Sequence, residues 1–215
     1  WSKKFNLPKK DIRKMVKIKE GYIAKKDLQQ IKTNVVNNNM FPWYYYPEPV
    51  YGFQKNYPCL THVLLPRYNY DTNEGYRINS DYYFLFTDII KKICKKHKIN
   101  IKRILRTALN YTTYFKQEYS NTHFDHTFPH TNIIIYLNKF TKGSTFLFKE
   151  TYKSNPPVSN KDRYDPYKAK KVIKEMTAEE GKYIIFPGEN YHAAGSPGED
   201  HEVRMICICT IEEEK

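Results

Sequence analysis

The pattern of hydrophobic and polar positions divides the sequence near residue 99. Before that point, apolar residues recur at helical spacing in two segments, at 27–36 and from about 80 to 96. Because this spacing gathers apolar side chains on one side of a helix, both segments are predicted to pack against a core. The expected inward-facing residues are Leu28, Ile31 and Val35 in the first helix and Phe84, Ile89, Ile90 and Ile93 in the second.

After residue 99 the pattern becomes that of β-strands, with short runs rich in β-branched and aromatic residues. The runs cover 101–115, 131–137, 144–148, 182–186 and 203–211. A shorter alternating run at 15–23 precedes the first helix. Helices followed by antiparallel-looking strands predict an α+β, mainly β protein with a sheet sandwich or open barrel at its core.

We expect one structural domain overall. In it, residues 1–98 supply a basic arm and helical support, and residues 99–215 form the β-rich core. A polar stretch rich in Pro and Lys, 149–175, is predicted as a surface insertion in that core. The aromatic, Pro-rich segment 41–58 is predicted to cover one side of the core rather than to form a stacking platform.

The net charge of +13 is concentrated in two segments, because residues 1–30 carry a net +7 and residues 91–106 a net +8. Such segments suit nucleic acid or another polyanion. Only seven of the 36 basic residues are Arg, however, while Lys, Ile, Asn and Tyr are abundant. This composition is typical of an AT-rich genome, so nucleic acid is the less favoured partner.

The sequence also bears on the compartment. No stretch approaches the ~18 apolar residues of a membrane span, no signal-peptide pattern is visible at the start, and the four cysteines do not have disulfide-framework or zinc spacing. We therefore expect a cytoplasmic protein without a membrane partner, in the host cytoplasm if the gene is viral. No signal for an oligomeric state is present.

Three potential metal ligands stand out. His123 and Asp125 form a His-x-Asp pair just before the run 131–137, and His192 follows the run 182–186. In extended chain, residues two apart point to the same side, so both members of the pair can reach one ion. Two imidazoles and one carboxylate on one face are the triad expected of non-haem Fe(II) sites.

The surrounding motifs strengthen this hypothesis. In order, they are Thr-His-Phe-Asp at 122–125, Ile-Ile-Tyr-Leu-Asn at 134–138, Gly-Ser-Thr-Phe-Leu-Phe at 143–148, Glu-Gly-Lys-Tyr-Ile-Ile-Phe-Pro-Gly at 180–188, then His192 and Arg204. With them the chain resembles the Fe(II)/2-oxoglutarate-dependent dioxygenase superfamily, in its prolyl-hydroxylase-like branch. It departs from the usual Gly-Gly at 142–143, where it has Lys-Gly.

The resemblance implies a double-stranded β-helix (jelly-roll) core with N-terminal helices packed on one sheet. It implies a dioxygenase whose Fe(II) is held by His123, Asp125 and His192, with 2-oxoglutarate and O2 as co-substrates. Arg204 would bind the distal carboxylate of 2-oxoglutarate, on a strand face shared with Ile206 and Ile208. Tyr136, Tyr114 (or Tyr111) and Asn132 would be further contacts.

The implied reaction is hydroxylation of a C–H bond with release of succinate and carbon dioxide. The first expectation for the substrate is a prolyl or other peptidyl residue, or a free amino acid. Three alternatives remain: an oxidative nucleic-acid demethylase, a non-catalytic metal-binding jelly-roll module, and a cupin-like iron enzyme that does not use 2-oxoglutarate.

Other histidines are weaker candidates. His201 is a rival for the distal ligand position. His126 and His130 have the spacing of a helical zinc pair, but Pro129 between them argues against a helix. We expect these two to be loop histidines near the mouth of the pocket.

Overall fold

A computed structural model of the chain describes residues 16–46, 59–68, 77–153 and 169–214. The described helices are α1 (Lys25–Ile31), its π-helical continuation η1 (Lys32–Val36), and α2 (Tyr82–Lys96). The described strands are β1 (Lys19–Tyr22), β2 (Tyr44–Tyr46), β3 (Cys59–Leu65), β4 (Ile101–Thr113), β5 (Thr131–Tyr136), β6 (Thr145–Thr151), β7 (Val172–Met176), β8 (Lys182–Pro187), β9 (Asn190–Ala194) and β10 (Val203–Glu213).

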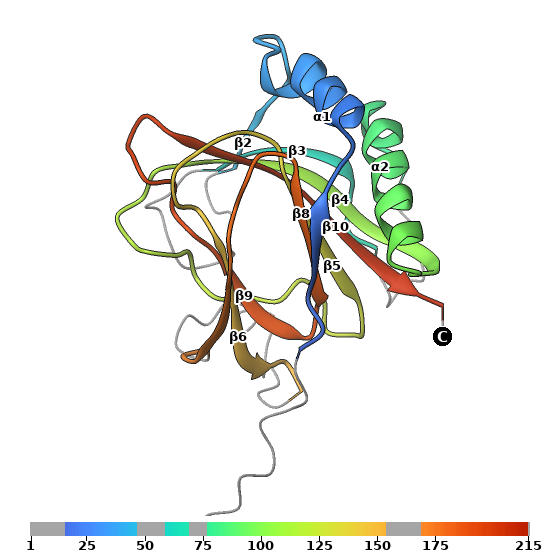
Figure 1. The fold of residues 1–215 in the computed structure, drawn as a ribbon, viewed down its shortest axis with the longest axis vertical. Coiled ribbons are helices and arrows are strands. Elements are labelled where there is room, and N and C mark those ends of the chain that lie inside the picture. The colour runs from blue at the N-terminus through green and yellow to red at the C-terminus, as the bar shows by residue number, and fades with distance from the viewer. Residues whose placement is uncertain (1–15, 47–58, 69–76, 154–168, 215) are drawn as a thin grey trace, which may run out of the picture.

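The strands form two antiparallel sheets. The large sheet has the order β1-β8-β5-β10-β4-β3-β2 and the small sheet the order β7-β6-β9. Figure 1 shows the small sheet opposite the large one, with the helices outside. The predicted jelly-roll core with N-terminal helices on one sheet is confirmed.

Strand alternation divides the core in two. On β5, Ile133 and Ile135 belong to the cluster that packs against the helices, whereas Ile134 belongs to the cluster between the sheets. On β10, Cys207 faces the helices and Ile206 faces the interior. Because successive strand residues point to opposite faces, each central strand is buried on both sides, and one face of it is available to line a cavity.

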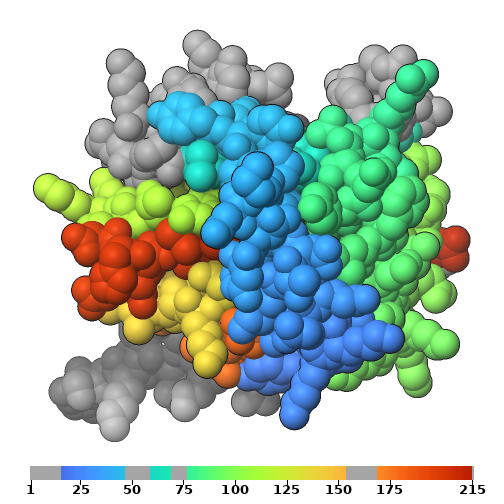
Figure 2. Space-filling view, turned by 90° about the horizontal axis from the view of Figure 1, so that it is seen from above, coloured from blue at the N-terminus to red at the C-terminus, as the bar shows by residue number. Residues whose placement is uncertain are grey.

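The helices cover the outer face of the large sheet. Figure 2 shows the N-terminal segment and α2 side by side on this face, and an ion pair between Lys92 Nζ and Asp27 Oδ1, 2.7 Å, joins the two helices. Six of the seven predicted inward-facing residues are buried or half-buried. The prediction that Phe84 faces inward is wrong, because this side chain is 58% exposed and Phe86 is buried instead. Phe86 shares helical spacing with the buried isoleucines, and Phe84 lies on the opposite side of the helix.

Several strands are absent from the sequence prediction: β2, β3, β7 and β9. Strand β7 overlaps the C-terminal end of the segment 149–175 predicted as a surface insertion, which is a correction to that boundary. Four of its five residues are exposed, so its sequence has no apolar alternation to reveal a strand. Residues 1–15 of the predicted basic arm and parts of the segments 41–58 and 149–175 lie outside the described residues.

Within the described ranges, no helix combines the length and apolar character needed to cross a bilayer.

Candidate iron and 2-oxoglutarate site

The backbone brings two of the predicted ligands together. His123 lies in the connection between β4 and β5, and His192 lies in β9. The two residues form an isolated antiparallel bridge, in which His123 N donates to His192 O at 2.9 Å and His192 N donates to His123 O at 2.8 Å. Their ring centroids are 4.5 Å apart. The two imidazoles are therefore set side by side by main-chain hydrogen bonds.

Asp125 completes the group from the same extended segment as His123. Its carboxyl is buried, and Oδ2 lies 3.4 Å from His192 Nε2. That oxygen accepts no hydrogen bond. The buried oxygen therefore faces an imidazole and retains its capacity to bind another group.

Both imidazoles are oriented by backbone carbonyls. His123 Nδ1 lies 3.2 Å from Asn121 O, and His192 Nδ1 lies 3.4 Å from Asn190 O. A carbonyl oxygen only accepts, so each neutral ring carries its proton on Nδ1 and has an unprotonated Nε2. A metal-ligating histidine characteristically donates its other ring N–H in this way. Burial, reinforced by the neighbouring His192, lowers the pKa of His123 to about 3 and keeps it neutral.

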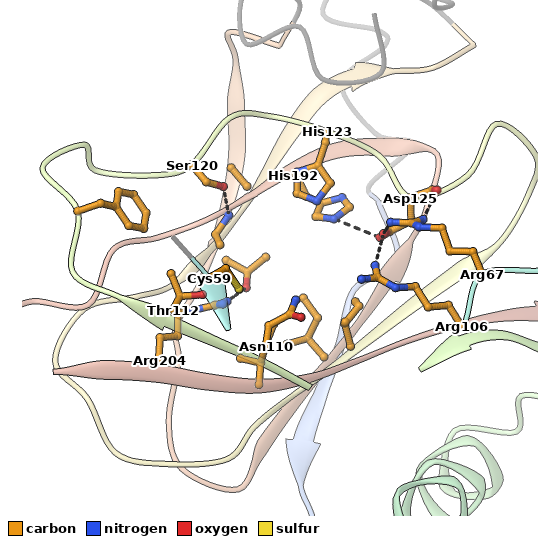
Figure 3. Close-up of a pocket in the computed structure, with 17 residues that line it drawn as sticks. Cys59, Arg67, Arg106, Asn110, Thr112, Ser120, His123, Asp125, His192 and Arg204 are labelled. Atoms are coloured by element: carbon orange, nitrogen blue, oxygen red, sulfur yellow. Dashed lines mark hydrogen bonds and ion pairs between the residues drawn. The ribbon is translucent and has the colours of Figure 1, made fainter. Parts of the chain in front are cut away.

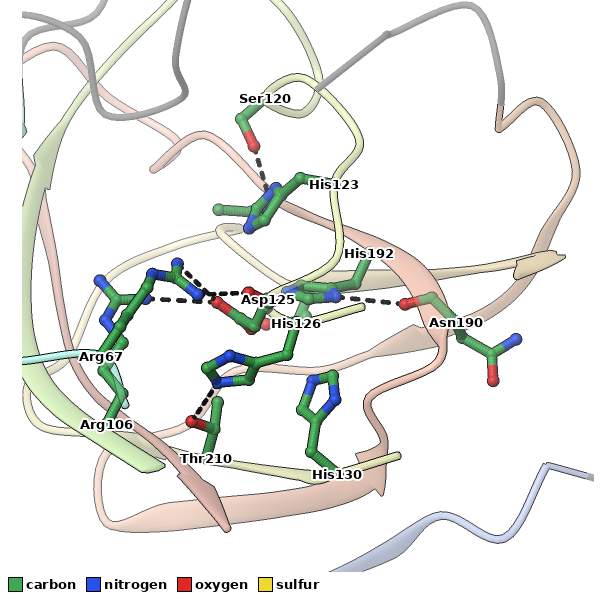
Figure 4. A network of polar contacts seen from close by, with 12 residues as sticks. Arg67, Arg106, Ser120, His123, Asp125, His126, His130, Asn190, His192 and Thr210 are labelled. Atoms are coloured by element: carbon green, nitrogen blue, oxygen red, sulfur yellow. Dashed lines mark hydrogen bonds and ion pairs between the residues drawn. The ribbon is translucent and has the colours of Figure 1, made fainter. Parts of the chain in front are cut away.

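Two arginines surround the other carboxylate oxygen, as Figure 4 shows. Arg67 Nη2 and Arg106 Nη1 lie 3.1 and 3.2 Å from Asp125 Oδ1, and Arg67 Nη1 donates to the Asp125 carbonyl. Burial alone would raise the pKa of Asp125. The close approach of the His192 imidazole and the charges of the two arginines outweigh burial and hold the pKa of Asp125 well below its usual range.

The donor set fits divalent iron. Two neutral imidazoles and an ionised carboxylate are the protonation states that a metal site requires, and the residue types match the non-haem Fe(II) triad. In the part of the chain that the structure describes, no three His, Cys, Asp or Glu side chains already converge closely enough to hold an ion. Asp125 Oδ2 is instead turned toward His192, so binding requires a side-chain adjustment.

A central cavity between the sheets connects this group to Arg204. Figure 3 shows Arg204 at one end of the cavity and Asp125 with the two imidazoles toward the other. Its described lining is Cys59, Arg67, Arg106, Asn110, Thr112, Phe115, Ser120, His123, Asp125, Ile134, Thr145, His192, Ala193, Ala194, Arg204, Ile206 and Ile208. Arg204, Ile206 and Ile208 thus share one face of β10, as strand alternation predicts.

Arg204 is a buried cation, with only 1% of its surface exposed. Its Nε donates to Gly143 O at 2.8 Å and its Nη2 to Thr145 Oγ1 at 3.0 Å. Among the described residues it forms no ion pair with a carboxylate. A buried charge without a counter-charge is costly, and burial lowers the pKa of this guanidinium. The geometry suits an anion that enters the cavity.

The predicted tyrosines do not line the cavity. Tyr136 is fully buried next to Arg204, where its hydroxyl lies 2.8 Å from Thr145 Oγ1 and its ring lies 5.6 Å from the guanidinium carbon. It supports Arg204 and Thr145 rather than lining the site. Tyr114 is 42% exposed just beyond the end of β4, and Tyr111 packs with Trp43 on the helix side of the sheet. Neither of these two reaches the central cavity.

The remaining candidates also lie elsewhere. Asn132 is fully buried on β5 and is not part of the cavity lining. His126 and His130 lie in a loop, as expected, but both are buried rather than at a cavity mouth, and His126 Nε2 contacts Thr210 Oγ1 at 2.8 Å. The side chain of His201 is 80% exposed beside Asp200, so it is not a rival ligand.

Six polar cavity residues escaped the sequence reasoning: Arg67, Arg106, Asn110, Thr112, Ser120 and Thr145. A signal existed for some of them. Arg106, Asn110 and Thr112 have the same parity on β4, so strand alternation places them on one face. Arginine itself was a second signal, because three of only seven arginines line this cavity.

Comparison with known proteins gives a consistent result at the level of fold. No known family profile matches the sequence, and no curated protein matches it. Among solved structures, a 2OG-Fe(II) oxygenase family oxidoreductase from Burkholderia pseudomallei is similar, with a TM-score of 0.59, 10% identity, and coverage of 87% of this chain and 79% of that one.

Two prolyl hydroxylases are also similar. The Pseudomonas putida prolyl-4-hydroxylase has a TM-score of 0.51 and 9% identity, with 94% of this chain and 95% of that one covered. The Trichoplax adhaerens enzyme, solved with a hypoxia-inducible-factor peptide, has a TM-score of 0.53 and 9% identity, with 92% and 84% covered. The chain therefore has the fold of the 2-oxoglutarate/Fe(II) oxygenases, including their prolyl hydroxylases.

Proposed function

We propose that the protein is an Fe(II)- and 2-oxoglutarate-dependent dioxygenase that hydroxylates a C–H bond and releases succinate and carbon dioxide. One observation carries the proposal. The same cavity contains a buried cation, Arg204, with no carboxylate partner among the described residues, and a buried carboxylate oxygen, Asp125 Oδ2, beside the imidazole of His192. A dianion and a divalent cation would satisfy both.

The residues have distinct roles in this proposal. His123, Asp125 and His192 would hold Fe(II), which with O2 supplies the oxidising chemistry that couples decarboxylation of 2-oxoglutarate to hydroxylation. Arg204 binds the distal carboxylate of 2-oxoglutarate through charge-assisted hydrogen bonds. Thr145 orients the guanidinium, with Gly143 O accepting from its Nε. The apolar side chains of Ile206 and Ile208 keep water away from this pair.

For the substrate we propose a prolyl or other peptidyl residue, or a free amino acid. The fold neighbours include two prolyl hydroxylases, one of them solved with a peptide. The basic segment 91–106 does not favour nucleic acid, because its helical part lies in α2 on the outer face of the large sheet and the central cavity lies on the inner face.

The test is an anaerobic titration of the metal-free protein with Fe(II) and then 2-oxoglutarate, followed by visible absorption. We expect a weak metal-to-ligand charge-transfer band that requires both additions. The band should be lost in His192→Ala and retained in His201→Ala, whose substituted side chain is exposed. Bound iron without a band on addition of 2-oxoglutarate would contradict the proposal and favour a cupin-like enzyme or a binding module.

A further inference from the structure

Arg67 holds Asp125 at two points (Figure 4). Its Nη1 donates to the main-chain carbonyl of Asp125, and its Nη2 lies 3.1 Å from the side-chain oxygen Oδ1. The N–H donors of a guanidinium have fixed directions in one plane. Because one such group binds both the main chain and the side chain of Asp125, it restricts how the carboxylate can turn relative to its own backbone.

This restraint acts where strand pairing does not. Asp125 lies between β4 and β5, outside any strand, whereas His123 and His192 are held by their reciprocal backbone bridge. The carbonyl of Asp125 accepts a hydrogen bond from the Arg67 side chain instead of from a neighbouring strand. Arg67 therefore does for Asp125 what the backbone bridge does for the two histidines.

The base of the Arg67 side chain is itself anchored. The next residue, Tyr68, donates its backbone N–H to Leu105 O at 2.7 Å. The ring of Tyr68 is buried, and its centroid lies 4.2 Å from the guanidinium carbon of Arg103. These contacts tie the chain after β3 to β4, so Arg67 reaches Asp125 from a fixed position. A side chain orients its partner accurately only when it is supported in this way.

The two oxygens of the Asp125 carboxylate are consequently not equivalent. Oδ1 is bound by Arg67 and also lies 3.2 Å from Arg106 Nη1. Oδ2 accepts no hydrogen bond from a described residue and lies 3.4 Å from His192 Nε2. A carboxylate can bind a metal ion through one oxygen or through both. With Oδ1 held by guanidinium N–H groups, Oδ2 is the oxygen that is presented to an ion.

We infer that Arg67 is a positioning residue of the proposed iron site, which holds Asp125 so that it binds the metal through Oδ2 alone. This inference rests on the proposed function and deepens it. A carboxylate bound through one oxygen leaves open a coordination position that a carboxylate bound through two would fill, and the proposed reaction needs open positions for both co-substrates. Arg67 precedes all the dioxygenase-like motifs at 122–204, so the N-terminal part of the chain takes part in shaping the site.

Substitution by lysine separates the planar fork from its charge. Arg67→Lys keeps a positive charge on a single ammonium group, which cannot hold both atoms of Asp125 in the same geometry. We expect the Kd for Fe(II), measured anaerobically without 2-oxoglutarate, to rise about 10- to 100-fold, the range for loss of a group that orients a metal ligand. Arg77→Lys, at an exposed position outside the described cavity lining, should leave the Kd unchanged. An Arg67→Lys protein with wild-type affinity overturns the inference.

A second comparison shows whether Arg67 acts through Asp125. In an Asp125→Ala background, Arg67→Lys should not change the remaining affinity for Fe(II), because the side chain that Arg67 holds is absent. An equal fold-loss of affinity in both backgrounds means that Arg67 has a general structural role, and it overturns the inference.

A third measurement uses the wild-type protein and does not depend on the folding of any variant. Infrared difference spectra of Fe(II) binding, with and without 13C-labelled aspartate, report the antisymmetric and symmetric carboxylate stretches. We expect the wide separation typical of binding through one oxygen. The narrow separation typical of binding through two oxygens contradicts the inference.

These outcomes are distinguishable from failure of the proposed function. A wild-type protein that binds no Fe(II) removes both the proposed function and the inference. A wild-type protein that binds Fe(II) but forms no charge-transfer band with 2-oxoglutarate removes the proposed function, while the Fe(II) affinities still decide the role of Arg67. A normal band together with an unchanged Kd in Arg67→Lys removes only the inference.

Discussion

His123 and His192 form a reciprocal pair of backbone hydrogen bonds, and their imidazole rings lie 4.5 Å apart. Opposed residues of an antiparallel pair have their side chains on the same face. The main chain alone therefore sets these two proposed ligands beside each other. Asp125, whose Oδ2 is turned to His192, is the proposed ligand whose side chain would have to adjust for an ion to bind.

The charge cluster around Asp125 gives the first prediction. Asp125→Asn should lower the free energy of unfolding of the metal-free protein by about 3 kcal/mol, because it leaves two arginines without their buried counter-charge. Arg106→Gln combined with Asp125→Asn should cost less than the sum of the two single changes. Denaturant unfolding of the four proteins measures this coupling, and strictly additive losses would contradict the cluster.

Replacing Arg204, unlike replacing Asp125, should cost the metal-free protein little stability. Because its charge has no carboxylate partner among the described residues, Arg204→Met should not lower the free energy of unfolding of the metal-free protein by more than about 1 kcal/mol. The same change should abolish the rise in melting temperature that 2-oxoglutarate gives the iron-loaded protein. A large loss of stability without any loss of 2-oxoglutarate response would assign Arg204 a structural role.

Gly188 provides a prediction about the turn that precedes His192. A Cβ at this position would lie 2.0 Å from Nε2 of His130, whose ring is buried. Gly188→Ala should therefore destabilise the protein by about 1–3 kcal/mol, as expected of overpacking. His130→Ala in the same chain should recover part of the loss, because it removes the ring. Thermal unfolding of the single and double variants tests this, and equal loss in both backgrounds would contradict the contact.

The buried thiols predict a dependence on alkaline pH. Burial raises the pKa of Cys94 from its ordinary 9.0 to about 11. The unfolded chain therefore releases a proton from Cys94 that the folded chain retains, and stability falls as pH rises above 9. The slope for this group is about 1.4 kcal/mol per pH unit. Cys94→Ala should remove that part of the slope.

The matched comparison is between wild type and Cys94→Ala in denaturant unfolding from pH 7 to pH 11. Below pH 8 the two stability curves should run parallel, offset by the lost packing, and above pH 9 they should converge. Curves that stay parallel throughout would show that the thiol does not retain its proton in the folded state.

The sequence by itself determined what depends on neighbouring residues. Strand alternation places Arg204 on one face with Ile206 and Ile208, and the three line one cavity. Helical spacing predicted Ile31, Ile89 and Ile93, which are all buried. These features follow from the periods of strand and helix, which are properties of local backbone geometry.

The tertiary structure decided everything that depends on which strands pair and where they end. It brings Arg67, from the chain just after the unpredicted strand β3, to Asp125, and it leaves Tyr114 beyond the end of β4. It also packs Tyr136 against Arg204, outside the described lining of the cavity. Such contacts join residues far apart in the chain, and no local period encodes their distances, because strand register and strand length are set by packing of the whole core.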